Sequence, residues 1–265
     1  MIEALDMPQK GSSIHLSVEE LYVRFGMQAV LEGVTFQIRR GEVFAVMGES
    51  GSGKSTLLKS LIGLVEPNSG EVLFDGVSFW RASNDVRQAI MRRSGVLYQR
   101  GALWSSMTLA ENVALPLEQF TELSGRDIRE LVSLKLALVG LTGADDAYPS
   151  ELSGGMLKRA GLARAMALDP EILFFDEPSA GLDPVNAKLL DDLILELCDS
   201  LGTTVVVVTH ELDSIYAIAD DTIFLDGREK NIIDRGSPRS LLQTSLDTRV
   251  RAFLTRGGER TKGEL

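Results

Sequence analysis

Residues 43–56 read VFAVMGESGSGKST, and this stretch decides the fold. The run VFAVM is apolar throughout and predicts a buried strand. The residues after it fit the pattern G-x-x-x-x-G-K-[ST], and a helix is predicted to begin at Lys54. Because this pattern needs a strand before it and a helix after it, the context favours a phosphate-binding loop over an ordinary glycine-rich turn.

The residue types of this loop suit phosphate. Glycines let backbone N–H groups point inward around phosphate oxygens, and the N-terminus of the next helix adds a positive partial charge. Lys54 places a cation on the β- and γ-phosphates of a nucleotide, and the hydroxyl group of Ser55 is suited to ligate Mg²⁺. The loop residues expected to contact the nucleotide are Gly48, Glu49, Ser50, Gly51, Ser52, Gly53, Lys54, Ser55 and Thr56.

Two later predicted strands, at residues 172–175 and 204–209, have apolar cores typical of a parallel sheet covered on both faces. Asp176 and Glu177 follow the first, and His210 follows the second, at the edge where open α/β sheets bind ligands. We expect Asp176 to hold Mg²⁺ through water, and Glu177 to orient or deprotonate a water aimed at the γ-phosphate. His210 could hydrogen-bond the γ-phosphate and that water, although a lone histidine is more often structural.

The whole pattern predicts one α/β domain at residues 14–256, with a β-rich start at about 14–47 and 70–80. A helical insertion is expected at about 100–165, and the remainder alternates strands and helices. Residues 128–139 carry apolar side chains at helical spacing, with Lys135 as the exception. Residues 1–13 and 257–265 are expected to be loose. Further predicted strands and helices are residues 14–25, 34–38, 71–74, 85–93, 95–98, 186–200, 211–219 and 222–225, and a helix capped by Ser237 with Pro238 as its first residue.

The composition narrows the class of protein. Hydrophobic residues make up 44% and charged residues 25%, as in a soluble globular domain. A net charge of −11 argues against nucleic acid as a partner. Cys198 is the only cysteine, which excludes an internal disulfide and a cysteine-rich zinc site. No apolar stretch reaches the roughly 20 residues of a spanning helix, and the first ten residues lack the apolar core of a secretory signal. We therefore expect a cytosolic protein, or one attached to a membrane through a partner.

A third motif identifies a family. Ser153 is predicted to cap a helix, leaving Gly154 and Gly155 open to an anion. Together with the other motifs, in this order, it makes the chain resemble the ATP-binding subunit of ABC transporters over about residues 14–254. The matching motifs are residues 48–55 (Walker A), Gln99 (Q-loop), residues 152–156 (signature), Asp176 and Glu177 (Walker B), residues 179–183 (D-loop) and His210 (switch histidine). Phe25 matches the aromatic residue that stacks on adenine, where tyrosine is more usual, and Met156 stands where glutamine is commoner.

The resemblance implies a P-loop NTPase core with an N-terminal antiparallel β subdomain and a helical insertion subdomain. It also implies an ATPase in which two copies pair head to tail, so that the signature of one copy covers the ATP held by the other. A permease would be driven through the cleft near Gln99 and the helical insertion. The implied roles are catalysis by Glu177, His210 and Lys54, magnesium binding by Ser55, Gln99 and Asp176, and nucleotide contacts by Phe25, Gln99, Ser153, Gly154 and Gly155 in addition to the loop.

Softer patterns resemble the Mla/Mce-type lipid-transport ATPases, including residues 99–104 (QRGALW) and 247–254 (DTRVRAFL). This resemblance implies phospholipid transport between the membranes of a Gram-negative bacterium. The chain would then be a peripheral subunit on the cytoplasmic face of the inner membrane. Its implied partners are a second copy of itself, an integral-membrane permease, a small accessory subunit and a periplasmic lipid-binding subunit. We expect Leu103 and Trp104 to meet the permease, unless Trp104 packs on its own helical insertion.

Two other functions remain open. The same chemistry would serve an importer of a small polar solute, or a soluble ABC ATPase such as an Fe–S assembly subunit. DNA-repair members are disfavoured because the 122 positions from Lys54 to Asp176 leave no room for a long coiled coil. Translation-type members carry two cassettes, whereas this sequence has one phosphate-binding loop.

Overall fold

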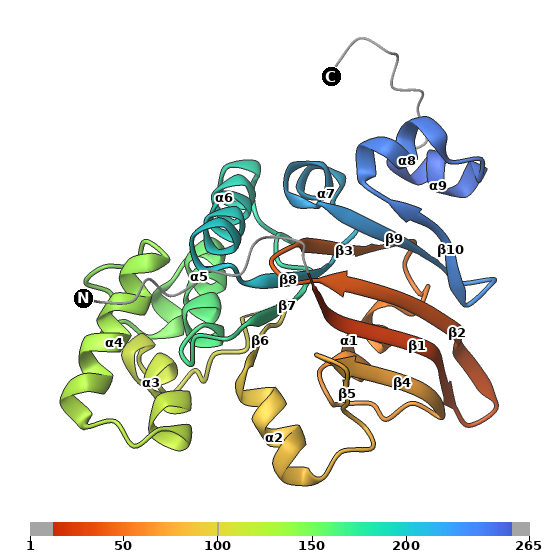
Figure 1. Ribbon diagram of the computed structural model, residues 1–265. Coiled ribbons are helices and arrows are strands. Elements are labelled where there is room, and N and C mark those ends of the chain that lie inside the picture. The colour runs from red at the N-terminus through yellow and green to blue at the C-terminus, as the bar shows by residue number, and fades with distance from the viewer. Residues whose placement is uncertain (1–12, 100, 256–265) are drawn as a thin grey trace, which may run out of the picture.

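The computed structural model describes residues 13–99 and 101–255, and its strands form two sheets (Figure 1). Sheet A is antiparallel throughout, with the strand order β2-β1-β4-β5. Its strands are β1 (Ile14–Phe25), β2 (Gln28–Arg39), β4 (Ser69–Phe74) and β5 (Val77–Ser78). The predicted antiparallel β subdomain is confirmed. The predicted loose segments lie almost wholly outside the described residues, as does Arg100 of the Q-loop motif.

Sheet B has the strand order β10-β9-β3-β8-β7-β6. Every neighbouring pair is parallel except β9 and β10. The strands β3 and β8 are buried at every position, as their apolar sequences predict for strands covered on both faces. The strands of sheet B are β3 (Val43–Met47), β6 (Ser94–Leu97), β7 (Ile172–Asp176), β8 (Thr204–Val208), β9 (Asp221–Asp226) and β10 (Asn231–Gly236).

The helix α1 (Lys54–Leu61) packs into the core that sheets A and B share. Its Leu57, Leu58 and Leu61 belong to one apolar cluster with side chains from both sheets. The rings of Phe36 in β2 and Phe44 in β3 stack there, with centroids 5.3 Å apart. Because α1 follows β3 directly, this packing holds the glycine-rich loop at the carboxyl edge of sheet B.

Four helices build a second apolar core on the other face of sheet B. They are α3 (Leu109–Phe120), α4 (Gly125–Leu138), α5 (Gly154–Ala165) and α6 (Pro184–Leu201). The helices α5 and α6 lie next to the strands, and α3 and α4 pack on α5. The helices α3 and α4 lie on the far side of the molecule from sheet A (Figure 1). In α4 the predicted apolar face is buried, and Lys135 is buried with it because it pairs with Asp169. The predicted helical insertion thus contains α3, α4 and α5.

The helix α5 touches the neighbouring backbone directly. A Cβ atom at Gly161 would lie 3.0 Å from the Cα and carbonyl oxygen of Gly101. A Cβ atom at Gly95 in β6 would lie 2.2 Å from the carbonyl oxygen of Ala165. A real Cβ atom does not occur at 2.2 Å from a backbone oxygen, and at 3.0 Å the neighbouring backbone would have to shift, so glycine permits this close contact between α5, β6 and the segment after β6.

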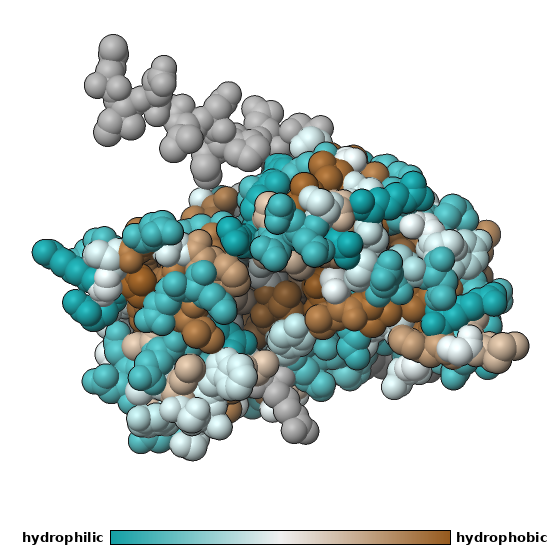
Figure 2. Space-filling model, turned by 90° about the horizontal axis from the view of Figure 1, so that it is seen from below, coloured by the Kyte–Doolittle hydropathy of each residue, from teal (hydrophilic) through white to brown (hydrophobic). Residues whose placement is uncertain are grey.

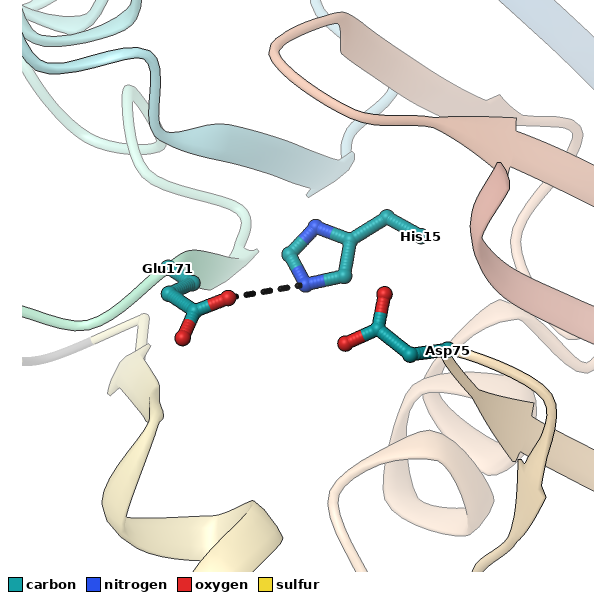
Figure 3. Close-up of side chains that lie close together, drawn as sticks. All are labelled: His15, Asp75 and Glu171. Carbon is teal, nitrogen blue, oxygen red and sulfur yellow. Dashed lines mark ion pairs between the residues drawn. The ribbon is translucent and has the colours of Figure 1, made fainter. Parts of the chain in front are cut away.

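A polar network joins the two sheets at the edge opposite the glycine-rich loop (Figure 3). The Nδ1 atom of the buried His15 of β1 shares a 2.7 Å hydrogen bond with the hydroxyl group of Thr204 in β8. Its Nε2 lies 4.0 Å from a carboxylate oxygen of Glu171. Burial, with Arg40 nearby, lowers the pKa of His15 to about 4, so the ring is neutral at pH 7.

The same network explains why these side chains are not a metal site. Ligand atoms of His15, Asp75 and Glu171 lie within 4.8 Å of one another. Both carboxylates, however, are already paired with Arg40 and Arg93, at 2.6–2.9 Å in three of these contacts. Two guanidinium groups would repel a cation, so the cluster is an ion-pair network between the sheets.

The remaining helices are α2 (Asn84–Arg92), α7 (Leu212–Ile218), α8 (Pro238–Thr244), α9 (Thr248–Leu254) and a short 3₁₀ turn (Pro149–Glu151). Ser237 caps α8 as predicted, accepting the N–H of Ser240. The prediction of a strand from residue 34 was too short, because β2 pairs with β1 from Gln28 onward. Within the described residues, no helix combines the length and the apolar character needed to span a bilayer.

Candidate nucleotide-binding site

A cavity of about 670 Å³ opens at the carboxyl edge of sheet B. It brings together the glycine-rich loop, the carboxylate that follows β7 and the histidine that follows β8, three segments far apart in sequence. The predicted site residues that line it are Gly48, Glu49, Ser50, Gly51, Gly53, Lys54, Ser55, Thr56, Glu177 and His210.

The loop has the form of an anion cradle. The Nζ of Lys54 donates to the carbonyl oxygens of Gly48 and Glu49, both at 2.8 Å, which curls the loop around the ammonium group. Gly48 has φ +148°, and a Cβ atom there would lie 2.3 Å from the carbonyl oxygen of Leu225. Any residue with a side chain would therefore push the loop off the end of β9.

Two further features fit phosphate groups at this cradle. The hydroxyl group of Ser52 is buried inside the loop without a hydrogen-bond partner, an arrangement that proteins seldom leave uncompensated. The N-terminus of α1 has no side-chain cap and no acidic residue in its first turn. Its free N–H groups and the helix dipole therefore favour an anion. The residues of this cradle therefore fit the phosphate groups of a nucleoside triphosphate.

Glu177 is held from four directions in a strained backbone conformation. Its φ is +49°, in the left-handed region that residues other than glycine seldom adopt. Its N–H donates to the carbonyl oxygen of Val208, and its own carbonyl accepts a 3.0 Å bond from the Nζ of Lys158 in α5. Thr209 and His210 bind its two carboxylate oxygens at 3.3 and 2.8 Å. Strain maintained in this way is typical of functional positions.

The charges around Glu177 perturb one another. Burial, and then the negative charge of Glu177, raise the pKa of Asp176 above its ordinary value. Burial lowers the pKa of Lys54 and of Lys158, and the two acids oppose that shift in both lysines. Carboxylate and hydroxyl oxygens are the donors that Mg²⁺ prefers, so Asp176 and Ser55 suit that ion.

The other predicted residues lie outside this cavity in the single chain. Phe25 is 54% exposed, and Gln99, Ser153 and Gly154 are also exposed. The predicted cap is confirmed, since the Ser153 hydroxyl accepts the N–H of Met156. Gly155 is buried at the start of α5.

Sequence reasoning missed Lys158, which reaches the carbonyl oxygen of Glu177 from the helix that follows the signature motif. It is 5% exposed, whereas lysines are seldom buried without a partner. The sequence contains one usable signal, because Lys158 falls among the apolar residues of α5. Its connection to Glu177 is nevertheless a tertiary contact that no local pattern shows.

The segment after Gln99 is fixed by one buried side chain. Asn112 in α3 is fully buried; its amide accepts the N–H of Trp104 and donates to the carbonyl oxygens of Trp104, Met107 and Thr108. The Trp104 side chain is 58% exposed. Leu103 instead packs against the apolar core beneath the helical insertion, so the two apolar residues have different environments.

Comparison with known proteins agrees with this geometry. Residues 31–180 match the family described as ABC transporter. The chain belongs to this family. It is an ABC ATPase of a membrane transporter.

Curated relatives of two kinds are similar over most of the chain. An intermembrane phospholipid transport system ATP-binding protein, MlaF of Haemophilus influenzae, is 41% identical over 239 residues, covering 90% of this chain and 89% of that protein. MlaF of Escherichia coli K12 is 42% identical over 229 residues, covering 86% and 84%. A probable ribonucleotide transport ATP-binding protein, mkl of Mycobacterium bovis, is 42% identical over 241 residues, covering 91% and 66%.

Solved ABC cassettes share the fold. CbiO1 from Clostridium perfringens, part of an ABC transporter complex, superposes with a TM-score of 0.79 and 29% identity, covering 87% of this chain and 91% of that one. A dimeric post-hydrolysis structure of the ATP-binding cassette MJ0796, with ADP and phosphate bound, gives 0.76 and 30%, covering 84% and 98%. The predicted P-loop fold is confirmed.

Proposed function

We propose that this ABC ATPase powers the movement of phospholipid between the two membranes of a Gram-negative bacterium. The observation that carries the proposal is the similarity to MlaF of Haemophilus influenzae, at 41% identity over 239 residues. The similarity runs through the whole cassette, including the segments on either side of the nucleotide motifs.

In this proposal the ATP phosphates occupy the cradle of residues 48–56, and Lys54 turns from the loop carbonyls toward the β- and γ-phosphates. Glu177 positions an attacking water and accepts its proton, and His210 holds the Glu177 carboxylate in that orientation. Ser55, Asp176 and, after a closing movement, Gln99 would hold Mg²⁺. When bound, that ion supplies positive charge against the β- and γ-phosphate oxygens.

The exposed signature supports a second copy of the chain as the partner that completes the site. Ser153 and Gly154 are exposed and do not line the cavity of their own chain. In a head-to-tail pair they would cover the γ-phosphate held by the other copy, together with the N-terminus of α5. Phe25 would stack on adenine at the outer end of the site.

A groove beside the helical insertion supports a permease as the membrane partner. A hollow of about 260 Å³ lies between α2, β6, α3 and α5, and residues that line it include Met91, Arg92, Pro116, Phe120 and Arg164. Seen from the side of α2, hydrophobic surface gathers in and around a hollow of this face (Figure 2). Arg164 also donates to the carbonyl oxygens of Gly101 and Ala102, at 3.2 and 2.8 Å. A loop of the permease seated here would therefore touch the segment that carries Gln99.

This arrangement would place the chain on the cytoplasmic face of the inner membrane, as a peripheral subunit. A small accessory subunit and a periplasmic lipid-binding subunit would complete a transporter of this kind. The cargo is tested by deleting the gene. We expect a weakened outer-membrane barrier to detergents, restored by the wild-type chain and not by a variant that cannot hydrolyse ATP.

The similarity to mkl favours one alternative cargo, a ribonucleotide. An intact detergent barrier together with lost ribonucleotide uptake in the deletion strain would contradict the phospholipid proposal. ATP hydrolysis by the purified transporter in vesicles gives a second measure. Stimulation by phospholipid, with no response to added ribonucleotides, is the expected result.

A further inference from the structure

The C-terminal helix α9 lies against the nucleotide cavity, although none of the nucleotide motifs falls in it. Ala252 and Phe253 line the cavity beside the glycine-rich loop. The ring of Phe253 packs edge-on against Phe224 of β9, with centroids 5.2 Å apart. The hydroxyl group of Tyr216 in α7 donates to the carbonyl oxygen of Leu254 at 3.2 Å. The helix is thus anchored to two elements of the core and presents one side to the cavity.

Arg249 connects α9 to the turn between β9 and β10. Its Nη1 lies 3.1 Å from Oδ1 of Asp226 and 3.7 Å from a carboxylate oxygen of Glu229. The same Oδ1 of Asp226 accepts the N–H groups of Arg228 and Glu229, at 2.9 and 2.8 Å. Asp226 is buried whereas Arg249 is partly exposed, so this carboxylate joins the turn to a guanidinium group at the protein surface.

The turn between β9 and β10 packs on the glycine-rich loop. A Cβ atom at Gly227 would lie 3.3 Å from the Cα of Ser52 and 3.6 Å from the carbonyl oxygen of Gly51. The end of β9 meets the loop as closely, through Leu225 and Gly48. A displacement of the turn would therefore be felt directly by the loop that holds the phosphates.

We propose that α9 is part of the ATP site, with Ala252 and Phe253 as a wall of the cavity and Arg249 as a positioning residue for the glycine-rich loop. The inference rests on the proposed occupancy of the cavity by ATP. It assigns a nucleotide-binding role to residues 247–254 (DTRVRAFL), which lie outside the nucleotide-binding motifs of the family.

The wall is tested with Ala252→Trp, because Ala252 is exposed and a larger side chain there would project into the cavity instead of the core. Arg251→Trp is the matched control, since Arg251 is exposed on the same turn of α9 and does not line the cavity. We expect a fluorescent ATP analogue to bind the Ala252→Trp chain at least about fivefold more weakly, with melting temperature unchanged, and to bind the control like the wild type.

The positioning role of Arg249 is tested with Arg249→Gln, with Arg249→Lys as the conservative variant. Arg235→Gln is the control, because Arg235 pairs with Asp221 at the other end of the same two strands, at 2.9 Å. Arg249→Gln removes partly exposed ion pairs with Asp226, Glu229 and Asp247. We expect it to raise the KM for ATP about two- to fivefold, with kcat within about twofold. Arg249→Lys should restore part of the affinity, and Arg235→Gln should leave the KM unchanged.

The outcomes separate this inference from the proposed function. Normal ATP binding by both Ala252→Trp and Arg249→Gln would overturn the role of α9 while leaving the nucleotide site intact. A lower melting temperature of Arg249→Gln with an unchanged KM would likewise reduce Arg249 to a structural role. Failure of the wild-type chain to bind ATP would overturn the proposed function and this inference together.

Discussion

The Nδ1 atom of His210 lies 2.8 Å from Oε1 of Glu177, so the switch histidine and the expected base are already joined within a single chain. The other carboxylate oxygen receives the Thr209 hydroxyl at 3.3 Å. With its backbone held by Val208 and Lys158 as well, Glu177 has little freedom to turn away from the cavity.

Glu177→Gln should abolish hydrolysis while leaving ATP binding intact. The amide keeps the shape of the carboxylate and removes the proton acceptor, so turnover should fall about a hundredfold or more. ATP that persists should keep the closed pair of chains together. Size-exclusion chromatography with ATP and Mg²⁺ measures this, and no gain of dimer over the wild type would contradict the role of Glu177.

Lys54→Ala should weaken ATP binding itself. The substitution removes a hydrogen bond to a charged group worth about 1.5–3 kcal/mol, which corresponds to roughly a tenfold loss of affinity or more. It also releases the carbonyls of Gly48 and Glu49 that shape the loop. Equilibrium binding to the monomer is the direct measurement, and unchanged steady-state turnover would disprove the phosphate-loop assignment.

Ser153→Arg should prevent the ATP-dependent dimer without weakening ATP binding to the monomer, because Ser153 does not line the cavity of its own chain. Losing the helix cap costs about 1 kcal/mol of stability, so Ser153→Asn, which can still cap α5, serves as the control for capping. Weaker binding to the isolated Ser153→Arg monomer would contradict a site shared between copies.

Trp104→Glu should detach the ATPase from its permease while sparing basal hydrolysis. The side chain is 58% exposed, and exposed tryptophans are enriched at interface hot spots. Leu103 is an unsuitable probe, because a charge there would disturb the core on which it packs. Leu64→Glu, at a residue 60% exposed in the turn after α1, controls for added surface charge. Co-purification with the membrane chain is the measurement, and equal recovery of both variants would disprove the contact.

His15→Gln should flatten the pH dependence of stability between about pH 4 and 6.5. The folded pKa of about 4 lies below the ordinary 6.5, so the unfolded chain binds more protons in this window. Stability therefore falls as the pH falls, by up to about 1.4 kcal/mol per pH unit. Asp191, whose burial raises its pKa to about 6, contributes the opposite slope. Only the difference between wild type and variant in urea unfolding isolates His15, and identical slopes would contradict the assignment.

Strong local patterns made much of the fold predictable. The glycine-rich loop, the apolar strands before Asp176 and His210, the serine caps and the amphipathic helix at residues 128–139 each leave a recognisable pattern in a short stretch of sequence. The missed strands lack such a pattern. The strand β5 has only two residues, and β10 is a half-buried edge strand without a continuous apolar run.

The sequence predicted which residues gather at the candidate site, but not most of the contacts that hold them there. Sequence order brought the loop, Glu177 and His210 to one edge, because all three follow parallel strands. Three connections depend on tertiary structure and have no local sequence pattern. They are the bond from Lys158 to Glu177, the pairing of Arg249 with Asp226 and the inward packing of Leu103. Consecutive apolar residues such as Leu103 and Trp104 carry no signal of which one faces solvent.

The close approach of Gly161 to Gly101 couples α5 mechanically to the segment after β6. A Cβ atom at Gly161 would lie 2.9 Å from the Leu97 side chain and 3.0 Å from the backbone of Gly101, so the two segments are packed closely enough for motion of one to be passed to the other. A force applied by a membrane partner near Trp104 would reach the N-terminus of α5 and, through Lys158, the strained backbone of Glu177. A larger side chain at Gly161 would push α5 away from the segment after β6 and so break the coupling between them.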